Sequence, residues 1–431
     1  MFSRIQDWLL NNKTVGQTVA KNTFWLFSGQ LISRLLRAAI VIYAARVLGA
    51  SSWGAFSYAL GIATFLTIFS DIGINALITK EATRNPQLKD QYVSTAFFTK
   101  LGLLSILILS VIIFFPYLTK IEEAAVIMPI LIFVFAFDTL RDLGSAVSRA
   151  LEKMQIEAGV TIFTNFAIVA LGFLFLTANQ TSQSLAFAYA LGSALGLAAI
   201  FYTLRSHFNN IFKNFNKSLV KPILATAWPF GLMALMGAIM LNTDIIMLGW
   251  LRSPAEVGYY SVAQKLIQLL YVLPALLATS IFPIMARLSK SDPQQVKNIL
   301  EKSVATVLLI SIPVVILGIA FAPLIINILF GAEYSPAILT FQILMATILI
   351  VYPSTLIGNA IFAYDQQKSF ITFVLTAAIG NVVFNFLLIP PLGIEGAAIS
   401  TIFTQLITNA LIWRKAKKIT GFCVTKFRIS A

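Results

Sequence analysis

The sequence predicts an all-α polytopic membrane protein of about twelve transmembrane helices, because it is strongly apolar, falls into helix-length apolar runs and places its basic residues asymmetrically between them. Hydrophobic residues make up 58% of the 431 residues and charged residues 11%, whereas soluble proteins carry about 25% charged residues. A soluble domain of this length could not bury so much apolar surface. The composition therefore argues against a soluble enzyme.

The chain contains twelve apolar runs, each long enough for the roughly 20 residues that a spanning helix needs. Six of them form a predicted N-terminal lobe at 24–205 and six a C-terminal lobe at 222–413, joined by a basic linker at 206–221. No loop is long enough to fold as a further domain. The runs cover residues 24–47, 54–79, 92–117, 124–147, 158–178, 184–205, 222–250, 256–286, 298–326, 337–363, 369–389 and 394–413.

The two ends of the chain lie outside these runs. Residues 1–23 lack the continuous apolar core and the cleavage site of a signal peptide, so we expect the segment to be retained. Its apolar residues, Trp8 among them, recur at helical spacing, which predicts an amphipathic helix on the cytoplasmic surface. Residues 414–431 form a basic tail with the only cysteine, Cys423, which excludes an intramolecular disulfide.

The basic residues predict the orientation in the membrane. An even number of spans places both termini on one side, and the net charge of +14 lies mostly in loops. The positive-inside rule predicts that both termini are cytoplasmic, and topology explains the positive charge better than nucleic-acid binding does. With that orientation the opposite loops hold only Arg46, Lys120 and Arg252, and the cytoplasmic segments hold Lys13, Lys21, Lys80, Arg84, Lys89, Arg149, Lys153, Arg205, Lys213, Lys217, Lys221, Arg287, Lys290, Lys297, Lys302, Lys368 and the tail RKAKK.

The two predicted lobes show a faint sequence echo. Residues 54–59 read GAFSYA and residues 258–263 read GYYSVA, each just after a short outer loop that follows the first span of its half. Six spans per half with the same orientation predict two bundles related by an axis along the membrane normal. That plan suits a transporter.

A polar stripe in the first span is the first candidate for function, because a charge at mid-bilayer costs at least about 2.5 kcal/mol. Gln30, Arg34 and Arg37 follow at i, i+4 and i+7, so they share one helix face. Arginine keeps its charge near neutral pH. The stripe therefore needs an anion, which is either a protein carboxylate or a substrate phosphate. We favour the substrate, because two arginines one turn apart exceed what a single salt bridge needs.

Carboxylates in the second and fourth spans are candidates for binding a coupling ion. Asp71 lies with Asn75 at i, i+4, and Asp138 lies with Arg141 and Asp142. A carboxylate that titrates with access to either side can link ion and substrate movement. The Asp138 cluster could also neutralise itself and act as a structural group.

The seventh and eighth spans carry the corresponding polar residues of the C-terminal lobe. Asn242, Lys265 and Gln268 are candidates for binding substrate, and Asp244 is a further candidate for binding the coupling ion. Asp244 and Lys265 could instead form an ion pair that locks two neighbouring helices. Together with the arginine stripe, these residues carry more positive than negative charge, which suits a diphosphate and disfavours an organic cation.

The motifs that the sequence lacks narrow the function further. The only histidine, His207, lies in the basic linker, so no zinc site of His/Cys type and no histidine acid–base chemistry are expected. No GxxxxGK[ST] sequence occurs, which argues against ATP hydrolysis. We expect no cofactor or metal and no catalytic residues, and we expect transport energy to come from an ion gradient or from the substrate gradient.

Several stretches of the chain resemble the polysaccharide transporter family, the lipid-linked oligosaccharide and O-antigen flippases of the multidrug/oligosaccharidyl-lipid/polysaccharide exporter superfamily. The stretches read AARVLGASSWGAFSYALGIATFLTIFSDIGINALITKEATR at 44–84, NTDIIMLGWLRSPAEVGYYSVAQKL at 242–266, LFGAEYSPAILTFQIL at 329–344 and PLGIEGAAIST at 391–401. The resemblance implies two six-helix lobes in a V-shaped exporter fold that alternates between inward-open and outward-open states. Because only twelve spans are predicted, the additional lipid groove of fourteen-helix relatives is not expected here.

The resemblance also implies a substrate class. Family members move glycans linked to undecaprenyl diphosphate or a related polyprenyl carrier from the cytoplasmic to the outer leaflet, in the cell membrane, beside polysaccharide polymerases and glycosyltransferases. The positions that match the family's cationic cavity are Arg34, Arg37 and Lys265, with Asp244 nearby in sequence. The first hypothesis is therefore a flippase coupled to H⁺ or Na⁺. The alternatives are a multidrug cation antiporter of the same superfamily and a non-transporting scaffold for glycan assembly.

Overall fold

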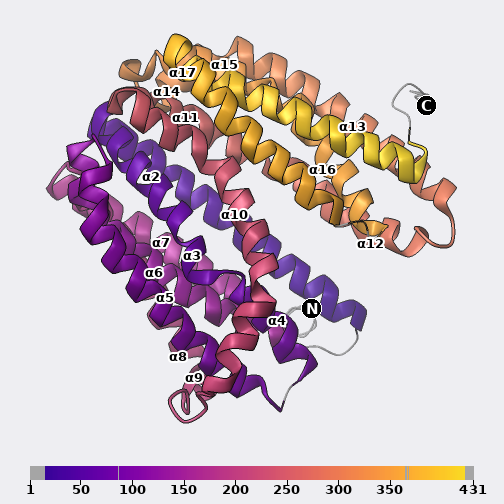
Figure 1. Ribbon diagram of the computed structural model, residues 1–431. Helices are drawn as coiled ribbons and strands as arrows, with labels where there is room; N and C mark the ends of the chain where they lie inside the picture. Colours follow the sequence, from indigo (N-terminus) through magenta and orange to yellow (C-terminus); the bar gives the residue numbers. More distant parts are fainter. Residues whose placement is uncertain (1–14, 86, 365, 367, 423–431) are drawn as a thin grey trace, which may run out of the picture. The chain divides into compact units, whose positions relative to one another are not determined.

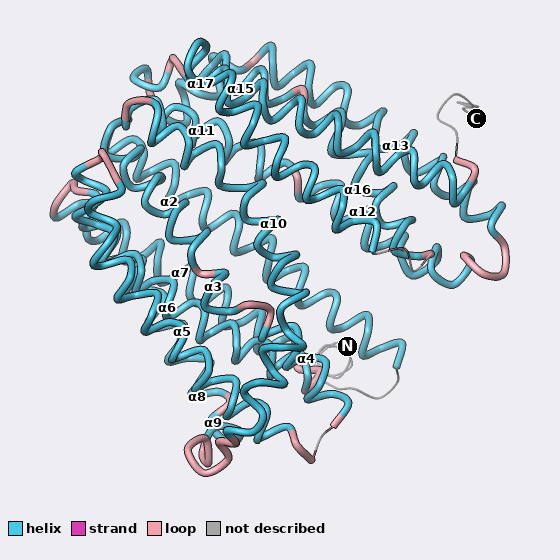
Figure 2. Tube along the Cα trace, in the orientation of Figure 1, coloured by secondary structure: helices cyan, strands magenta, loops and turns pink. Residues whose placement is uncertain are grey.

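The computed structural model describes residues 15–85, 87–364, 366 and 368–422, and these residues are almost entirely helical (Figures 1 and 2). No strand occurs in the described ranges. Most of the predicted amphipathic N-terminal segment and the end of the tail, with Cys423, lie outside them. The prediction of an all-α fold is confirmed.

The helices follow one another with short connections, as the apolar runs predict. The first helices are α2 (Val15–Leu66), α3 (Ile68–Asp71), α4 (Ile74–Arg84), α5 (Lys89–Leu118), α6 (Glu122–Ala150), α7 (Met154–Ala178), α8 (Ser182–Thr203) and α9 (Arg205–Phe208). They are followed by η1 (Lys217–Leu219), α10 (Val220–Leu251), α11 (Pro254–Leu270), α12 (Val272–Leu288), α13 (Pro293–Ala320), α14 (Ala322–Phe330), η2 (Ala332–Tyr334), α15 (Ala337–Met345), α16 (Thr347–Ala363) and α17 (Lys368–Thr420).

Local sequence determines where several helices begin. At the start of α11, the Ser253 side chain accepts a hydrogen bond from the Glu256 backbone N–H, and the Glu256 side chain accepts one from the Ser253 backbone N–H. Pro254 occupies the first helical position. This capping box satisfies two of the backbone donors that a helix N-terminus leaves unpaired. The Thr181 hydroxyl accepts from Ser184 in the same way at the start of α8.

Two glycines divide helices that are too long to be single spans. The helical stretches Ala20–Arg84 and Ser369–Thr420 contain 65 and 52 residues, which at 1.5 Å per residue is roughly 98 and 78 Å, against a hydrocarbon core of about 30 Å. Gly49 has φ 74° and Gly393 has φ 62°, a left-handed conformation that glycine adopts at little cost. Each stretch is therefore two spans joined at a glycine turn.

The number of spans follows from these breaks. In the described residues, nine helical stretches are long and apolar enough to cross a membrane. Two of them contain two spans each, and α11 with α12 forms a further span that is interrupted only at Tyr271. These stretches match the twelve predicted apolar runs, and the protein is a multi-pass membrane protein.

The chain packs into two compact units. One consists of residues 1–48 and 55–238, and the other of residues 49–54 and 239–431. The division falls inside α10, after the predicted linker at 206–221, so the first half of α10 belongs to the first unit. The physical reason is a close backbone contact: a Cβ on Gly231 of α10 would lie 2.6 Å from the Ile72 carbonyl carbon.

The glycines of the sequence echo contact each other in the second unit. A Cβ on Gly54 would lie 1.8 Å from the Pro254 carbonyl oxygen and 2.7 Å from the Gly258 nitrogen, and a Cβ on Gly258 would lie 2.1 Å from the Ala50 oxygen. The obstacles are backbone atoms, which cannot rotate away. The repeated glycines therefore permit the starts of two equivalent helices to pack directly against each other.

Gly54→Ala and Gly258→Ala are each expected to destabilise the protein by about 3 kcal/mol, at the upper end of what overpacking costs. Thermal unfolding of the purified protein in detergent measures the effect. The control is Gly102→Ala, because a Cβ on Gly102 has no atom within 4 Å. An unchanged melting temperature for both echo variants would contradict the close contact.

Candidate functional site

The predicted polar stripe is present on α2. Gln30, Arg34 and Arg37 are all exposed on this helix. Arg37 donates from Nε to Asn165 Oδ1 on α7 at 3.0 Å. No described residue lies within hydrogen-bond or ion-pair distance of Arg34, and no described carboxylate forms a salt bridge with either arginine. Both guanidinium groups are therefore available to an external anion.

Asn165 fixes the orientation of the Arg37 guanidinium. This asparagine is 4% exposed, and its Nδ2 donates to the Thr161 backbone oxygen at 2.8 Å. Because one end of the amide is held by the backbone, the other end presents an oxygen to Arg37 Nε. The two terminal nitrogens of Arg37 remain for a ligand, which is the geometry that phosphate oxygens accept.

In the predicted cluster of α6, one arginine is paired with both carboxylates. Arg141 forms ion pairs with Asp138 at 2.7 Å and with Asp142 at 3.2 Å. Asp138 also lies within electrostatic range of Arg37, but its direct partner is Arg141. This arrangement favours the structural interpretation of Asp138, which was one of the two that the sequence left open.

Asp71 lies where the second span is interrupted. Helix α3 ends at Asp71 and α4 begins at Ile74, and between them Ile72 and Gly73 have φ 45° and 82°. The Asp71 Oδ1 accepts from the Lys100 ammonium of α5 at 2.7 Å, and Asn75 Oδ1 accepts from the same ammonium at 2.8 Å. Asp71 and Asn75, the pair predicted at i, i+4, therefore bind the ammonium group of a lysine of the same chain.

Lys100 is not among the residues predicted from the sequence. Its side chain is fully buried, whereas the Asp71 side chain is 26% exposed. A buried lysine that cannot reach water is costly unless it is paired. A lone lysine inside the apolar run 92–117 is the signal that could have found it.

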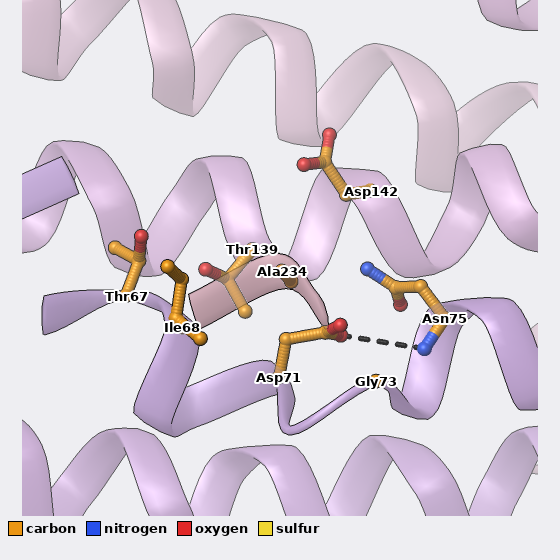
Figure 3. A pocket seen from close by; sticks show the side chains of 8 residues that line it. All are labelled: Thr67, Ile68, Asp71, Gly73, Asn75, Thr139, Asp142 and Ala234. Carbon is orange, nitrogen blue, oxygen red and sulfur yellow. Dashed lines mark hydrogen bonds between the residues drawn. The ribbon is translucent and has the colours of Figure 1, made fainter. Parts of the chain in front are cut away.

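A small pocket opens at this helix break. It has a volume of about 140 Å³ and is lined by Thr67, Ile68, Asp71, Gly73, Asn75, Thr139, Asp142 and Ala234. Figure 3 shows the Asp71 carboxylate facing Asn75 across the interruption, with the Asp142 carboxylate extending from α6. The break thus leaves carboxylate and amide groups accessible inside the first unit.

The second unit contains a buried carboxylate surrounded by neutral donors. Asp244 of α10 is 3% exposed. Its Oδ1 accepts from Asn381 Nδ2 at 2.9 Å and from Asn385 Nδ2 at 2.6 Å. Its Oδ2 accepts from the Tyr260 hydroxyl at 2.5 Å and from the Thr401 hydroxyl at 2.8 Å. We call these five residues the Asp244 cage.

Four members of the cage are not among the residues predicted from the sequence. Tyr260 comes from α11, and Asn381, Asn385 and Thr401 come from α17 on both sides of its glycine turn. The signal that was available is the i, i+4 pair of asparagines in the apolar run 369–389. Their meeting with Asp244 depends on packing between distant spans, which one sequence does not reveal.

The remaining predicted residues of the C-terminal lobe lie near the cage in sequence. Asn242 belongs to α10, and Lys265 and Gln268 belong to α11; all three are half-buried. The predicted ion pair between Asp244 and Lys265 stays a prediction. The assignment of these three residues to substrate also stays a prediction.

The fold and these buried polar groups define a class of protein, a two-unit helical membrane protein of the transporter type. The family model for polysaccharide biosynthesis proteins matches residues 19–289, more than half of the chain. The chain belongs to this family. A second family model, MatE, matches residues 229–390.

Individual relatives are similar in sequence to this chain over nearly its whole length. A protein of Haloferax volcanii named "Probable low-salt glycan biosynthesis flippase Agl15" is 23% identical over 96% of this chain and 86% of its own. The capsular polysaccharide biosynthesis protein CapF of Staphylococcus aureus is 21% identical over 90% of this chain and 97% of its own. Among solved structures, the lipid II flippase MurJ in an inward closed conformation superposes with a TM-score of 0.78 at 17% identity, over 91% of this chain and 87% of that one. This last likeness confirms the predicted fold.

Proposed function

We propose that the chain is a flippase that moves polyprenyl-diphosphate-linked oligosaccharides from the inner to the outer leaflet by alternating access, for the synthesis of cell-surface polysaccharide. The family and the names of its relatives support a glycan lipid as the substrate. The observation that carries the proposal is the arginine stripe of α2, where no described carboxylate forms a salt bridge with Arg34 or Arg37. We further propose that the chain is not an enzyme.

The arginine stripe suits the diphosphate of such a carrier. Guanidinium groups bind phosphate oxygens in pairs and keep their charge in an apolar environment. Asn165 accepts a hydrogen bond only from Nε of Arg37. The two terminal nitrogens of Arg37 and the whole guanidinium group of Arg34 can therefore bind the two phosphates. Gln30 on the same face is a proposed further contact for this ligand. Within the second unit, Asn242, Lys265 and Gln268 are separate proposed contacts for substrate.

The Asp244 cage is the proposed site of the coupling ion. Four neutral groups donate to its carboxylate, whereas Asp71 and Asp138 are each paired with a basic side chain. If Asn381 and Asn385 turn their amides over, each offers an oxygen instead of a nitrogen. The cage then presents the carboxylate, two amide oxygens and two hydroxyls, the ligand set that a small hard cation prefers. H⁺ is the alternative coupling ion of this proposal.

The setting of the protein follows from the same proposal. We place it in the cell membrane with both termini in the cytoplasm, as the distribution of basic residues predicts. Polysaccharide polymerases and glycosyltransferases would be its neighbours in the synthesis of the glycan.

A multidrug cation antiporter is the second candidate, because the MatE model matches residues 229–390. The arginine stripe argues against it, since an organic cation would meet like charges on α2. Loss of drug resistance with unchanged surface glycan, in a strain that lacks the chain, would reverse this ranking.

Arg34→Ala with Arg37→Ala is expected to lower glycan export at least tenfold, because the diphosphate loses its cationic partners. Replacing both by lysine is expected to restore part of the export, since the charge returns without the paired geometry. Surface glycan is measured in a deletion strain at matched membrane abundance. Arg46→Ala is the control, because Arg46 is an exposed arginine of the same helix outside the stripe.

Normal export by both double variants would show that the arginines are not needed for substrate binding. The flippase proposal would then have to rest on other residues. If deletion of the chain leaves surface glycan unchanged, the proposed function itself is wrong.

A further inference from the structure

The end of α8 and the segment that joins it to α10 expose three aromatic rings. Phe212 is 80% exposed, Phe215 is 42% exposed and Tyr202, at the end of α8, is 73% exposed. The rings of Phe212 and Phe215 each lie 5.4 Å from the ring of Phe98 on α5. Tyrosine rings are enriched at the interface between hydrocarbon and headgroups, and phenylalanine rings occur on the apolar faces of segments that lie in it.

Hydrogen bonds hold this segment against the start of α5. Ser94 donates to the Ile211 backbone oxygen, and the Asn216 backbone N–H donates to Thr95 Oγ1 at 3.1 Å. The Asn216 side chain donates to Gln91 Oε1 at 3.4 Å. The aromatic and basic side chains of the segment are therefore presented from a tethered backbone.

Three lysines lie among these rings. Lys213, Lys217 and Lys221 are exposed, and none of them forms an ion pair with a described carboxylate. Burial, and then the nearby charge of Lys89, lower the pKa of His207 below its ordinary value, so this histidine is neutral at pH 7. The positive charge of the surface thus comes from the lysines.

A groove is formed by the end of the segment, with Lys217, and the first turns of α10, with Lys221. It has a volume of about 690 Å³ and is lined by Phe215, Lys217, Val220, Lys221, Leu224 and Ala225. Its apolar side continues onto α10, which is a membrane-spanning helix. An occupant must therefore carry a negative head for the lysines and an apolar body for the groove. The N-terminus of α10 adds to the attraction for an anion.

We propose that this surface, formed by Tyr202, Phe212, Lys213, Phe215, Lys217 and Lys221 and called here the linker patch, binds anionic phospholipids of the leaflet that it faces. Inorganic phosphate would leave the apolar groove unfilled, and a zwitterionic lipid would leave the lysines without a counter-charge. Basic residues near an anionic leaflet each contribute about 1 kcal/mol, or roughly fivefold in affinity. The proposal concerns membrane lipid and does not depend on the substrate that the chain transports.

The test is native mass spectrometry of the full-length protein, purified in detergent and given equal amounts of phosphatidylglycerol and phosphatidylcholine with identical acyl chains. Wild-type protein is expected to retain phosphatidylglycerol at least about tenfold more than phosphatidylcholine. Lys213→Gln/Lys217→Gln/Lys221→Gln is expected to bring the ratio close to one. The control, Lys415→Gln/Lys417→Gln/Lys418→Gln in the last turns of α17, removes the same charge elsewhere and is expected to keep the preference.

Several results would overturn the proposal. They are equal retention of the two lipids by wild-type protein, an equal loss of preference in the control variant, displacement of the lipid by inorganic phosphate, and displacement by undecaprenyl diphosphate at a lower concentration than phosphatidylglycerol. The last result would assign the patch to substrate capture. Unchanged elution of all variants in size-exclusion chromatography shows that they are folded.

Discussion

Asp244→Ala is expected to lower transport at least about 100-fold, which corresponds to about 2.7 kcal/mol, and to lower the melting temperature by several degrees. The alanine removes the acceptor from the hydroxyls of Tyr260 and Thr401 and from two asparagine amides. Each buried donor that is left without a partner costs about 1–3 kcal/mol. Transport is measured in proteoliposomes with and without Na⁺ and pH gradients, and stability by thermal unfolding in detergent.

Variants that each remove one hydrogen-bond donor to Asp244 distinguish a loss of ion binding from a loss of packing. Tyr260→Phe and Thr401→Val keep the carboxylate and lose one hydrogen bond each, so we expect losses of transport of about tenfold or less. Asp292→Asn is the control, because Asp292 is an exposed carboxylate that caps α13. Wild-type transport by Asp244→Ala with unchanged dependence on both gradients would exclude the cage as the coupling site.

The ion pair between Asp71 and Lys100 is expected to respond asymmetrically to mutation. Asp71→Asn leaves the fully buried Lys100 charge without its counter-ion, and breaking a buried pair in this way costs about 3–5 kcal/mol. Lys100→Met leaves the Asp71 carboxylate, which is 26% exposed at the pocket and can be hydrated. We therefore expect Lys100→Met to lower the melting temperature less than Asp71→Asn does.

The double variant Asp71→Asn/Lys100→Met is expected to recover much of the stability, because neither charge remains unpaired. Asp90→Asn on α5 is the control, since Asp90 is exposed at the helix start. Equal losses for the two single variants, with no recovery in the double variant, would contradict the asymmetry. Thermal unfolding of the wild type and all four variants in one detergent decides between these outcomes.

The fold was predictable from the sequence to a large extent, because lipid requires every spanning helix to be long and apolar. Hydropathy alone marks the twelve runs, and even the two glycine turns fall at gaps between runs. The limits of the packing units were not predictable. They depend on a backbone contact between Gly231 and Ile72, which no periodicity signals.

The candidate site was predictable only in part. The arginine stripe follows from helical spacing within one span, and it is present on one exposed face. Asp71 and Asp244 were recognised as carboxylates within spans, but their partners Lys100 and Asn385 come from other spans. A single sequence shows which groups need a partner, and the packing of distant helices decides which partner they obtain.

The division of the chain has a consequence for how the protein is made. The short turn at residues 49–54 is synthesised early but packs with the second unit, where Glu333 accepts from the Ala50 backbone N–H at 2.7 Å and Pro254 contacts Gly54. A ribosome-bound chain that ends at residue 238 therefore holds this turn without its partners. During biogenesis the turn can pack only after the later helices have been made. We expect a fragment of residues 1–238 to be inactive alone and to regain function when residues 239–431 are co-expressed.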